Sequence, residues 1–236
     1  MDVDACLRRV EADGFAILPA IYSQAEVAEI LAQLEAAIAK HKVEGPLRAT
    51  SGTIYAARNI LVLWPRVKEI WKQPAILNCL RQVLGHEFGL VRVLYFDKPP
   101  GQSWALPWHK DTTISVRDNR LPSSYFSKPT TKGGIPHVQA PHPLLEKMLT
   151  LRIHLDDVTE TNGPLKVMAG SHRGVESNVV VAIFGEAGDV LLMRPLVSHC
   201  SNGSHPKTNC HRRILHLEFA GTPLLPDEYE WHDFWT

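Results

Sequence analysis

The chain has no excess of charge of either sign. Its 25 Lys and Arg residues equal its 25 Asp and Glu residues, and nothing basic is clustered enough to follow a phosphate backbone. Since nucleic acids and anionic membranes attract proteins through basic surfaces, we expect neither as a partner. No apolar run approaches the roughly 20 residues that a membrane-spanning helix needs, so we expect no membrane association.

Cysteine is also scarce. The four cysteines lie far apart except for Cys200 and Cys210, and no secretory signal precedes the first predicted helix. These features predict a cytoplasmic protein. Cys200 and Cys210 adjoin His199 and His211, which makes a zinc site an alternative, but the close paired spacing of structural zinc sites is missing.

The length allows one substantial core, and we predict a single domain over residues 1–236. Its front, residues 1–87, is expected to be mostly helical. Ser23 and Glu26 have the spacing of a capping box, and the apolar residues that follow recur at helical intervals. A second helical region is expected from about residue 65 to residue 84, interrupted by a proline.

The character of the sequence changes after residue 87. Short runs rich in Val, Ile and Leu are separated by Gly, Pro, Asn and Asp, which predicts antiparallel strands. The clearest runs are 90–96, 149–155, 179–184, 190–193 and 214–219. We therefore predict a mainly β fold with flanking helices. The β part is a double-stranded β-helix, or cupin-like jelly roll, over residues 88–220, with the N-terminal helices packed on one sheet.

His109 and Asp111 are separated by one residue in the run LPWHKDTT, so on a strand both side chains would project from the same face. His199 lies in a second apolar run, residues 192–202, which could lie antiparallel beside the first. Two imidazoles and one carboxylate are the ligand set of non-haem Fe(II) oxygenases, which keep the opposite positions open for a chelating co-substrate and O2. A His-x-Asp pair alone is common by chance, so this interpretation depends on a further element.

That element is a pair of arginines, Arg212 and Arg213, at the start of the apolar run that reaches Phe219. A guanidinium matches a carboxylate as a two-pronged donor and stays charged at any working pH. It therefore suits the distal carboxylate of a dicarboxylate co-substrate. A shift of one residue in register would turn the other side chain inward, so both arginines are candidates.

With this constellation the chain resembles the phytanoyl-CoA dioxygenase family of Fe(II)- and 2-oxoglutarate-dependent oxygenases over nearly its whole length. Besides the ligands, the similar segments are ADGFAILP (12–19), TLRIHLDD (150–157), NGPLKVMAGSH (162–172) and the turn at 188–189. The resemblance implies iron binding by His109, Asp111 and His199. It also implies contacts of 2-oxoglutarate with Arg212, for which Arg213 is the alternative, and with Ser201.

Other residues are weaker candidates for the site. Those expected near the co-substrate, because they lie on the strand facing the site or beside the ligand pair, are Tyr95, Lys98, Gln102 and Thr112. The expected substrate contacts are Trp108, Arg117, Tyr125, His137 and Gln139. An anionic group of the substrate could meet Arg117, Arg120 or Lys128.

Residues 119–143 form a long stretch rich in Pro, Ser, Thr and Gly, directly after the ligand pair. Long structureless loops inside compact domains are usually functional or disordered, so we expect an active-site lid, with a mobile surface loop as the alternative.

The resemblance implies an enzyme that uses Fe(II), 2-oxoglutarate and O2 to hydroxylate a small-molecule or acyl substrate, releasing succinate and CO2. Two alternatives are a metal-binding jelly roll without turnover and a cupin-type isomerase that does not use 2-oxoglutarate. Neither alternative needs the arginine. We expect a small-molecule substrate and a monomer or homodimer.

Overall fold

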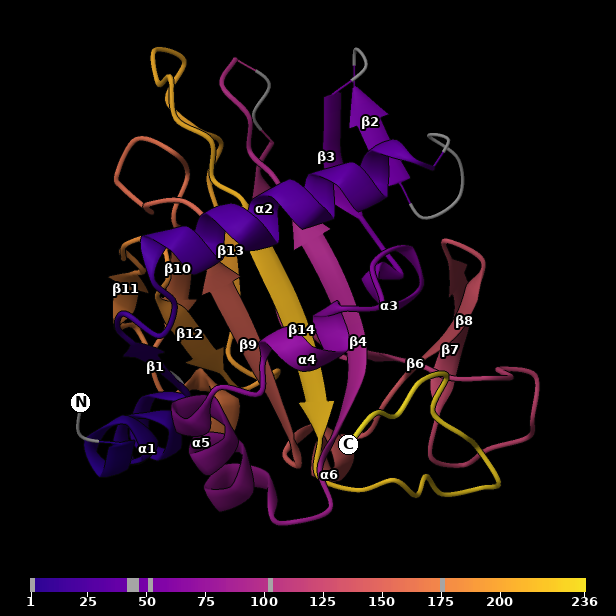
Figure 1. The fold of residues 1–236 in the computed structure, drawn as a ribbon. Coiled ribbons are helices and arrows are strands. Elements are labelled where there is room, and N and C mark those ends of the chain that lie inside the picture. The colour runs from indigo at the N-terminus through magenta and orange to yellow at the C-terminus, as the bar shows by residue number, and fades with distance from the viewer. Residues whose placement is uncertain (1–2, 42–46, 51–52, 102–103, 175–176) are drawn as a thin grey trace.

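The computed structural model describes residues 3–41, 47–50, 53–101, 104–174 and 177–236 (Figure 1). Among these residues, the largest sheet has seven antiparallel strands. Its strands are, in spatial order, β1 (Phe15–Leu18), β12 (Val190–Met193), β9 (Met148–His154), β14 (Ile214–Ala220), β4 (Gly89–Phe96), β3 (Thr53–Ala57) and β2 (Leu47–Thr50). Three of them therefore come from the front segment 1–87, which also supplies most of the helices.

Helices cover one face of the large sheet (Figure 1). They are α1 (Val3–Asp13), α2 (Gln24–Ala39), α3 (Ile60–Leu63), α4 (Val67–Ile70) and α5 (Pro74–Leu84). The predicted capping box at the start of α2 is confirmed, because the Glu26 amide donates to the Ser23 hydroxyl and the Ser23 amide donates to the Glu26 carboxylate. No helix in the described part of the chain is long and apolar enough to cross a bilayer.

The central strands differ between their two faces. On β14, Leu215 and Leu217 belong to the apolar core under the helices, whereas His216 and Glu218 line a cavity on the other face. Strand β4 shows the same alternation. Because successive side chains of a strand point to opposite faces, this pattern leaves one face of the sheet apolar and the other charged.

The opposite face of the large sheet looks toward a smaller sheet of four strands, completing the predicted jelly roll. The strands of this smaller sheet are, in spatial order, β11 (Val180–Ala182), β10 (Leu165–Met168), β13 (His199–Ser201) and β5 (Leu106–His109). A third sheet contains β6 (Thr113–Ser115), β8 (Ile135–Gln139) and β7 (Ser127–Lys132). Short helical turns, α6 (His142–Leu145) and η1 (Ser171–Arg173), complete the described elements.

Two local expectations were wrong. Residues 192–202 do not form one strand: the chain leaves β12 after Met193, turns at Pro195, which has no amide hydrogen for a sheet ladder, and enters β13 in the other sheet. Residues 119–143 are not structureless, because they contain the hairpin β7–β8, and residues 137–139 of β8 pair with β6. The hairpin pairs with β6, which immediately precedes this segment in the chain. The many Pro, Ser, Thr and Gly residues of the segment gave no sign of these strands.

Gly188 lies in the tight turn that precedes β12, where it contacts the loop before α2. Its φ is +99°, its carbonyl accepts hydrogen bonds from the Ile21 and Tyr22 amides at 3.1 Å each, and a Cβ there would collide with the Tyr22 carbonyl. Gly85, at the end of α5, has a similar φ of +87°, but a Cβ there meets nothing within 4 Å.

We expect Gly188→Ala to lower the free energy of unfolding by about 3 kcal/mol or more, since it adds a backbone clash to the conformational cost. Gly85→Ala is the matched control and should cost only about 1–2 kcal/mol, the conformational part alone. Urea unfolding of both variants measures the difference. Equal losses would mean that the chain near Tyr22 moves aside at little cost.

Candidate metal centre and active site

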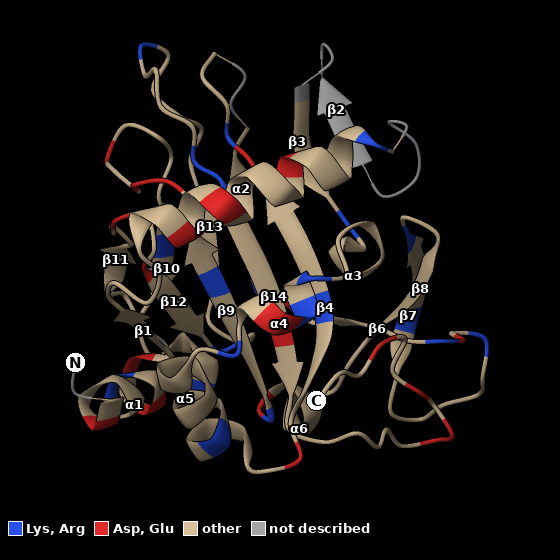
Figure 2. Ribbon diagram, in the orientation of Figure 1, with Lys and Arg blue, Asp and Glu red and all other residues tan. Residues whose placement is uncertain are grey.

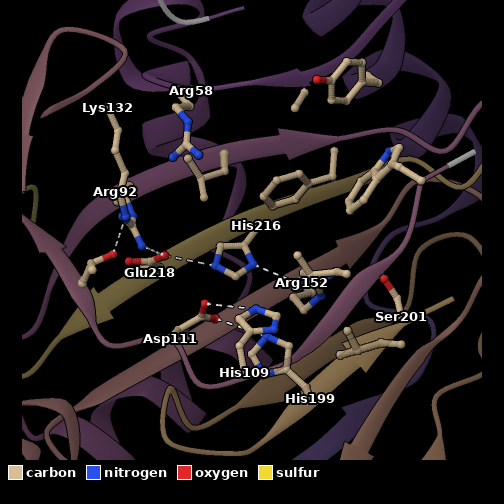
Figure 3. A pocket seen from close by; sticks show the side chains of 18 of the residues that line it. Arg58, Arg92, His109, Asp111, Lys132, Arg152, His199, Ser201, His216 and Glu218 are labelled. Atoms are coloured by element: carbon tan, nitrogen blue, oxygen red, sulfur yellow. Dashed lines mark hydrogen bonds and ion pairs between the residues drawn. The ribbon is translucent and has the colours of Figure 1, made fainter. Parts of the chain in front are cut away.

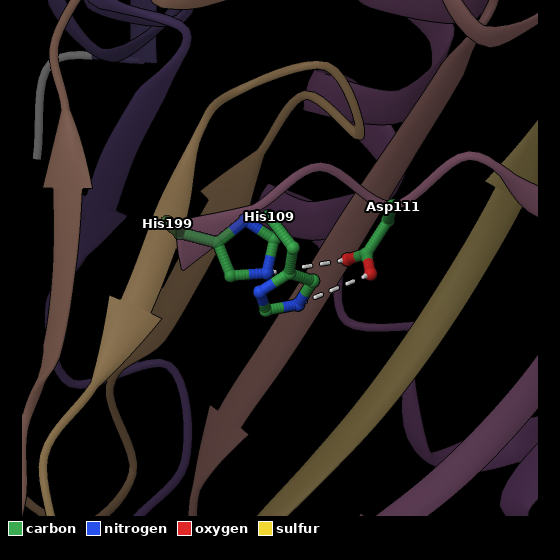
Figure 4. Close-up of side chains that lie close together, drawn as sticks. All are labelled: His109, Asp111 and His199. Atoms are coloured by element: carbon green, nitrogen blue, oxygen red, sulfur yellow. Dashed lines mark ion pairs between the residues drawn. The ribbon is translucent and has the colours of Figure 1, made fainter. Parts of the chain in front are cut away.

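Two histidines of the smaller sheet and an aspartate that follows its edge strand β5 bring their side chains together (Figure 4). His109 ends β5 and His199 begins β13, and these two residues are direct partners in the antiparallel pairing. Asp111 lies beyond the end of β5, so it does not share a strand face with His109 as the sequence suggested. Its position is fixed instead by its amide, which donates to the Pro195 carbonyl at 3.0 Å.

The three possible ligand atoms lie within 4.8 Å of one another. His199 Nε2 is 3.6 Å from Asp111 Oδ2, and His109 Nε2 is 3.9 Å from Asp111 Oδ1. These separations suit atoms that converge on one ion. In the described part of the chain this is the one group of three or more such ligands, and neither Cys200 nor Cys210 belongs to it.

Hydrogen bonds to the backbone fix the tautomer of both histidines. His109 Nδ1 lies 2.7 Å from the Pro107 carbonyl oxygen, and His199 Nδ1 lies 2.9 Å from that of Val197. A carbonyl oxygen only accepts, so each Nδ1 carries the hydrogen and each Nε2 keeps its lone pair toward the site. Burial lowers the pKa of His199 to about 4, which keeps that lone pair available at neutral pH.

The triad opens into a cavity of about 300 Å³ between the two sheets (Figure 3). This volume is at the lower end of small-molecule sites. Its lining contains five cationic residues, Arg58, Arg92, Lys132, Arg152 and Arg212, and two carboxylates, Asp111 and Glu218. Basic residues on β4 and β9 and an acidic residue on β14 are visible within the large sheet (Figure 2). The cavity is therefore strongly cationic in a chain without net charge.

Arg212 and Arg213 have opposite surroundings. Arg212 is 2% exposed, lines the cavity, and has a buried Nε without a hydrogen-bond partner among the described groups. Burial, then the nearby charge of Arg152, lowers the pKa of Arg212 to about 9, so it remains charged at neutral pH. Arg213 points away from the cavity and donates to Asp156 at 2.6 and 2.9 Å and to Glu35 at 2.8 Å. Of these two arginines, only Arg212 therefore presents its guanidinium to a ligand in the cavity.

Ser201 lies near Arg152 at one end of the cavity (Figure 3), and its hydroxyl is oriented by a hydrogen bond from the buried Lys98. Lys98 Nζ donates to the Ser201 hydroxyl oxygen at 3.0 Å and also to the Asn202 carbonyl. Burial, then the charges of Arg212 and Arg152, lowers the pKa of Lys98 to about 7. Because the Ser201 oxygen accepts from Lys98, its own hydroxyl hydrogen is available to an acceptor in the cavity.

A chain of hydrogen bonds crosses the cavity floor from Arg152 to Arg92 (Figure 3). Arg152 Nη1 lies 3.1 Å from His216 Nδ1, and since arginine only donates, that nitrogen accepts. His216 therefore carries its hydrogen on Nε2 and donates it to Glu218 Oε1 at 3.1 Å, while Arg92 donates to the same oxygen at 2.5 Å. Burial alone would raise the pKa of Glu218, but the charge of Arg92 and these hydrogen bonds lower it to about 2.

The expected substrate contacts lie outside the lining of this cavity. Trp108 and Tyr125 are exposed, Arg117 pairs with Glu230 at 2.5 Å, His137 is buried beside a much smaller void of about 10 Å³, and Gln139 lies on β8 opposite Thr113. Arg120 likewise pairs with a neighbouring carboxylate, that of Asp118.

Among the weaker co-substrate candidates, Tyr95 lies in the core under the helices, and Thr112 is outside the lining. Gln102 lies outside the described residues. Sequence reasoning did not select Arg58, Arg92, Lys132, Arg152 or Glu218. For Arg92, Arg152 and Glu218 the one available signal was that each is a charged residue inside an otherwise apolar strand, β4, β9 and β14 respectively.

A sequence model of the phytanoyl-CoA dioxygenase family matches residues 10–214, a range that contains the triad and Arg212. The chain belongs to this family. Ectoine dioxygenase of Bordetella bronchiseptica, a similar protein, is 30% identical over 169 residues, which cover 69% of this chain and 47% of that protein. Ectoine dioxygenase of Nocardia farcinica is 27% identical over 171 residues, covering 71% of this chain and 50% of that protein. The chain thus spans about half the length of the curated relatives it matches.

Solved structures show the same fold. EctD from S. alaskensis with bound Fe superposes with a TM-score of 0.68 at 20% identity, over 91% of this chain and 75% of that one. EctD from the same source with 2-oxoglutarate and 5-hydroxyectoine gives 0.68 at 21% identity, over 91% and 74%. The non-haem α-ketoglutarate-dependent epimerase SnoN gives 0.64 at 16% identity, over 92% and 81%. These matches confirm the predicted jelly roll of this family.

We expect Asp111→Ala and His199→Ala each to remove most of the affinity for Fe(II), because the two remaining ligands chelate poorly. Metal analysis after anaerobic reconstitution measures the iron bound per chain. His205→Ala, an exposed histidine shortly after the triad's second histidine, is the control and should retain the metal. Stoichiometric iron in both triad variants would show that the ion binds elsewhere.

Proposed function

We propose that this chain is an Fe(II)- and 2-oxoglutarate-dependent dioxygenase that hydroxylates a small-molecule substrate and releases succinate and CO2. One observation carries the proposal: a two-histidine, one-carboxylate triad faces the same cavity as a buried arginine, Arg212, whose Nε has no acceptor among the described residues. Family membership supports the same reaction class. The two histidines lie on the smaller sheet, Asp111 follows β5 and Arg212 precedes β14, so we also propose that residues 1–236 act as a single catalytic domain.

The triad fits a divalent iron. His109 and His199 would each bind through Nε2, whose lone pair is kept by the hydrogen bond from Nδ1, and Asp111 would bind through its carboxylate. Three protein ligands would leave other positions of the ion open for a chelating keto acid and O2. Once bound, Fe(II), 2-oxoglutarate and O2 would supply the oxidising power of the reaction, while the protein would hold the reacting groups in position.

Arg212 fits the distal carboxylate of 2-oxoglutarate. A buried charge without a partner is costly, and a carboxylate that arrives with its own charge removes that cost through two parallel hydrogen bonds. Ser201, held by Lys98, can donate its hydroxyl hydrogen to the same ligand. Arg152 adds a second positive charge at this end of the cavity and keeps its guanidinium oriented through His216.

Two other functions would use the same fold. A metal-binding protein without turnover, or a cupin-type isomerase, needs the triad but has no use for a buried unpaired guanidinium. The test is a substrate screen that measures succinate formation by the iron-loaded protein. Succinate released in step with oxidation of one substrate supports the dioxygenase, and metal binding without any effect of 2-oxoglutarate supports the alternatives.

We expect 2-oxoglutarate, added anaerobically to the Fe(II) form, to produce the weak visible absorption band of a metal-chelated keto acid. Arg212→Ala should weaken 2-oxoglutarate binding by roughly 30-fold to several thousand-fold, since it removes a buried, charge-assisted, two-pronged contact. Titration of the band measures this affinity. Arg213→Ala is the matched control and should bind 2-oxoglutarate nearly as well as the wild type.

The two variants should also separate in stability. Arg213→Ala removes the guanidinium that binds Asp156 and Glu35 and should cost about 1.5–3 kcal/mol of unfolding free energy. Arg212→Ala removes a buried charge that has no hydrogen-bond partner among the described groups, so it should cost much less in the ligand-free protein. In the titration of the visible band, weaker 2-oxoglutarate binding by Arg213→Ala than by Arg212→Ala would assign the co-substrate to Arg213 and overturn the role given to Arg212.

We further propose that residues 119–143 act as a lid, although they contain a hairpin. Closing an active site keeps water from a reactive intermediate, and lid segments commonly do this. Because β8 lies between β6 and β7, and residues 137–139 pair with β6, we expect the amides of these residues to be protected from hydrogen exchange in the free protein. The gain on adding Fe(II), 2-oxoglutarate and a productive substrate should therefore appear in residues 119–126 and in β7. Full protection of these residues before any ligand is added would make the segment a fixed part of the scaffold.

A further inference from the structure

Two buried arginines of the cavity, Arg152 and Arg212, form no ion pair with a carboxylate among the residues that the structure describes. The buried Nε of Arg212 has no acceptor there. Arg152 is 7% exposed, and its Nη1 donates to the neutral ring of His216. A third arginine of the lining, Arg92, differs because it pairs with Glu218. The cavity therefore holds two guanidiniums whose charge a ligand can neutralise.

Each of these two charges adds to the cost of the other. Burial, then the charge of Arg152, lowers the pKa of Arg212 to about 9. Burial also lowers the pKa of Arg152 to about 10, so both groups stay charged at neutral pH. A ligand with two carboxylates offers one to each guanidinium and removes both costs. 2-Oxoglutarate, the co-substrate in the proposed function, is a ligand of this kind.

Arg152 lies beside the triad. In the close-up of the cavity it lies between His216 and Ser201, next to the histidine ligands (Figure 3). Its charge also reaches the triad: the charge of Asp111 raises the pKa of Arg152 against the larger effect of burial, and the charge of Arg152 adds to the burial that lowers the pKa of His199. Arg152 is thus placed where a ligand of the metal would pass on its way to Ser201.

Arg212 has different neighbours. It precedes β14, and its amide and carbonyl each form a hydrogen bond of 3.2 Å with the backbone of Lys98, whose ammonium donates to Ser201. Besides burial, the charges that act on Arg212 are those of Arg152 and Asp97. Arg212 therefore belongs with Ser201, and Arg152 lies between that pair and the triad.

The sheet fixes the direction of the Arg152 side chain. Arg152 on β9 and His216 on β14 are direct partners in the antiparallel pairing, so their side chains lie next to each other on the same face. His216 accepts from Arg152 at 3.1 Å and is itself held by donating to Glu218 at 3.1 Å. This contact uses one of the five N–H groups of the guanidinium and leaves others for a carboxylate in the cavity.

We propose that Arg152 binds the keto-acid end of 2-oxoglutarate, through the carboxylate next to the keto group, while Arg212 and Ser201 bind the distal carboxylate. The inference rests on the proposed function, in which the keto-acid end chelates the metal and so lies at the triad. Each carboxylate of the co-substrate would then meet one guanidinium. A keto acid that lacks the distal carboxylate should lose the contact with Arg212 and keep the one with Arg152.

Pyruvate separates the two arginines, because it has the keto-acid end of 2-oxoglutarate and no distal carboxylate. The Fe(II)-loaded protein is titrated anaerobically with each keto acid, and the visible band measures both affinities without turnover. We expect Arg152→Met to weaken the binding of both keto acids about 10-fold or more, since it removes a charge-assisted hydrogen bond to the end that they share. Arg212→Ala should weaken the binding of 2-oxoglutarate alone.

Arg194→Met is the matched control, because Arg194 is a partly buried arginine that donates to the carbonyls of Glu146 and Met148 and does not line the cavity. It should bind both keto acids as the wild type does. Arg152→Lys keeps a positive charge and should bind both more tightly than Arg152→Met. Metal analysis should find Fe(II) retained in both Arg152 variants, which separates a lost keto-acid contact from a lost ion.

Several results would overturn this role of Arg152 while the proposed dioxygenase stands. Weaker binding of 2-oxoglutarate with unchanged binding of pyruvate in Arg152→Met would assign Arg152 to the distal carboxylate. Unchanged binding of both keto acids would leave it no contact with the co-substrate, and loss of Fe(II) would make it a support of the triad. A wild type that forms the band with 2-oxoglutarate and never with pyruvate would show that the keto-acid end is not held in this way. If the wild type forms no band with 2-oxoglutarate, the proposed function itself fails.

Discussion

The site depends on a sheet whose two faces have opposite chemistry. Strands β4, β9 and β14 lie side by side in the middle of the large sheet, and on one face their apolar residues pack under the helices. On the other face, Arg92 of β4, Arg152 of β9 and Glu218 of β14 line the cavity. The apolar face supplies the free energy that holds the strands in place. That stability permits the other face to keep Arg92, Arg152 and Arg212 in a space where water cannot fully solvate them.

The hydrogen bonds on this charged face show how the cost is limited. Glu218 sits between Arg92 and His216, and His216 in turn accepts from Arg152, so two of the three arginines are oriented by one histidine and one carboxylate. A network in which every member has a partner is rigid, and rigidity of the supporting groups is what a catalytic site requires. Arg212 is the exception, and its isolation marks the place where a ligand belongs.

The sequence was sufficient for the parts of this molecule that local patterns encode. Alternation and turn residues predicted the strands, Ser23 and Glu26 predicted the start of α2, and the His-x-Asp spacing with a later histidine and arginine predicted which residues would meet. The choice between Arg212 and Arg213 needed the structure, because it depends on the register of the strand. In the structure the Arg212 amide and carbonyl pair with Lys98, which turns the Arg212 side chain inward.

The part of the cavity that Arg58 and Lys132 line could not be predicted from local patterns. Arg58 and Lys132 are single basic residues in unremarkable surroundings, and they become neighbours only because α3 and the β7–β8 hairpin come together. Trp108, Tyr125 and Arg117 were expected to contact the substrate because they are close to the ligands in sequence. Closeness in sequence does not specify which way a side chain faces, and none of the three lines the cavity. Equal numbers of acidic and basic residues over the whole chain likewise conceal a cavity in which the basic ones prevail.

In the proposed function, the binding of the co-substrate to Arg212 links the stability of the fold to the supply of a metabolite. A ligand that binds only the folded state stabilises it by an amount that grows with the logarithm of its concentration, about 2.7 kcal/mol when the ligand is present at 100 times its Kd. For a domain with a typical stability of roughly 5–15 kcal/mol, that is a large fraction. A cell rich in the dicarboxylate would therefore keep more of this protein intact and resistant to proteolysis than a starved cell, with no change in its synthesis.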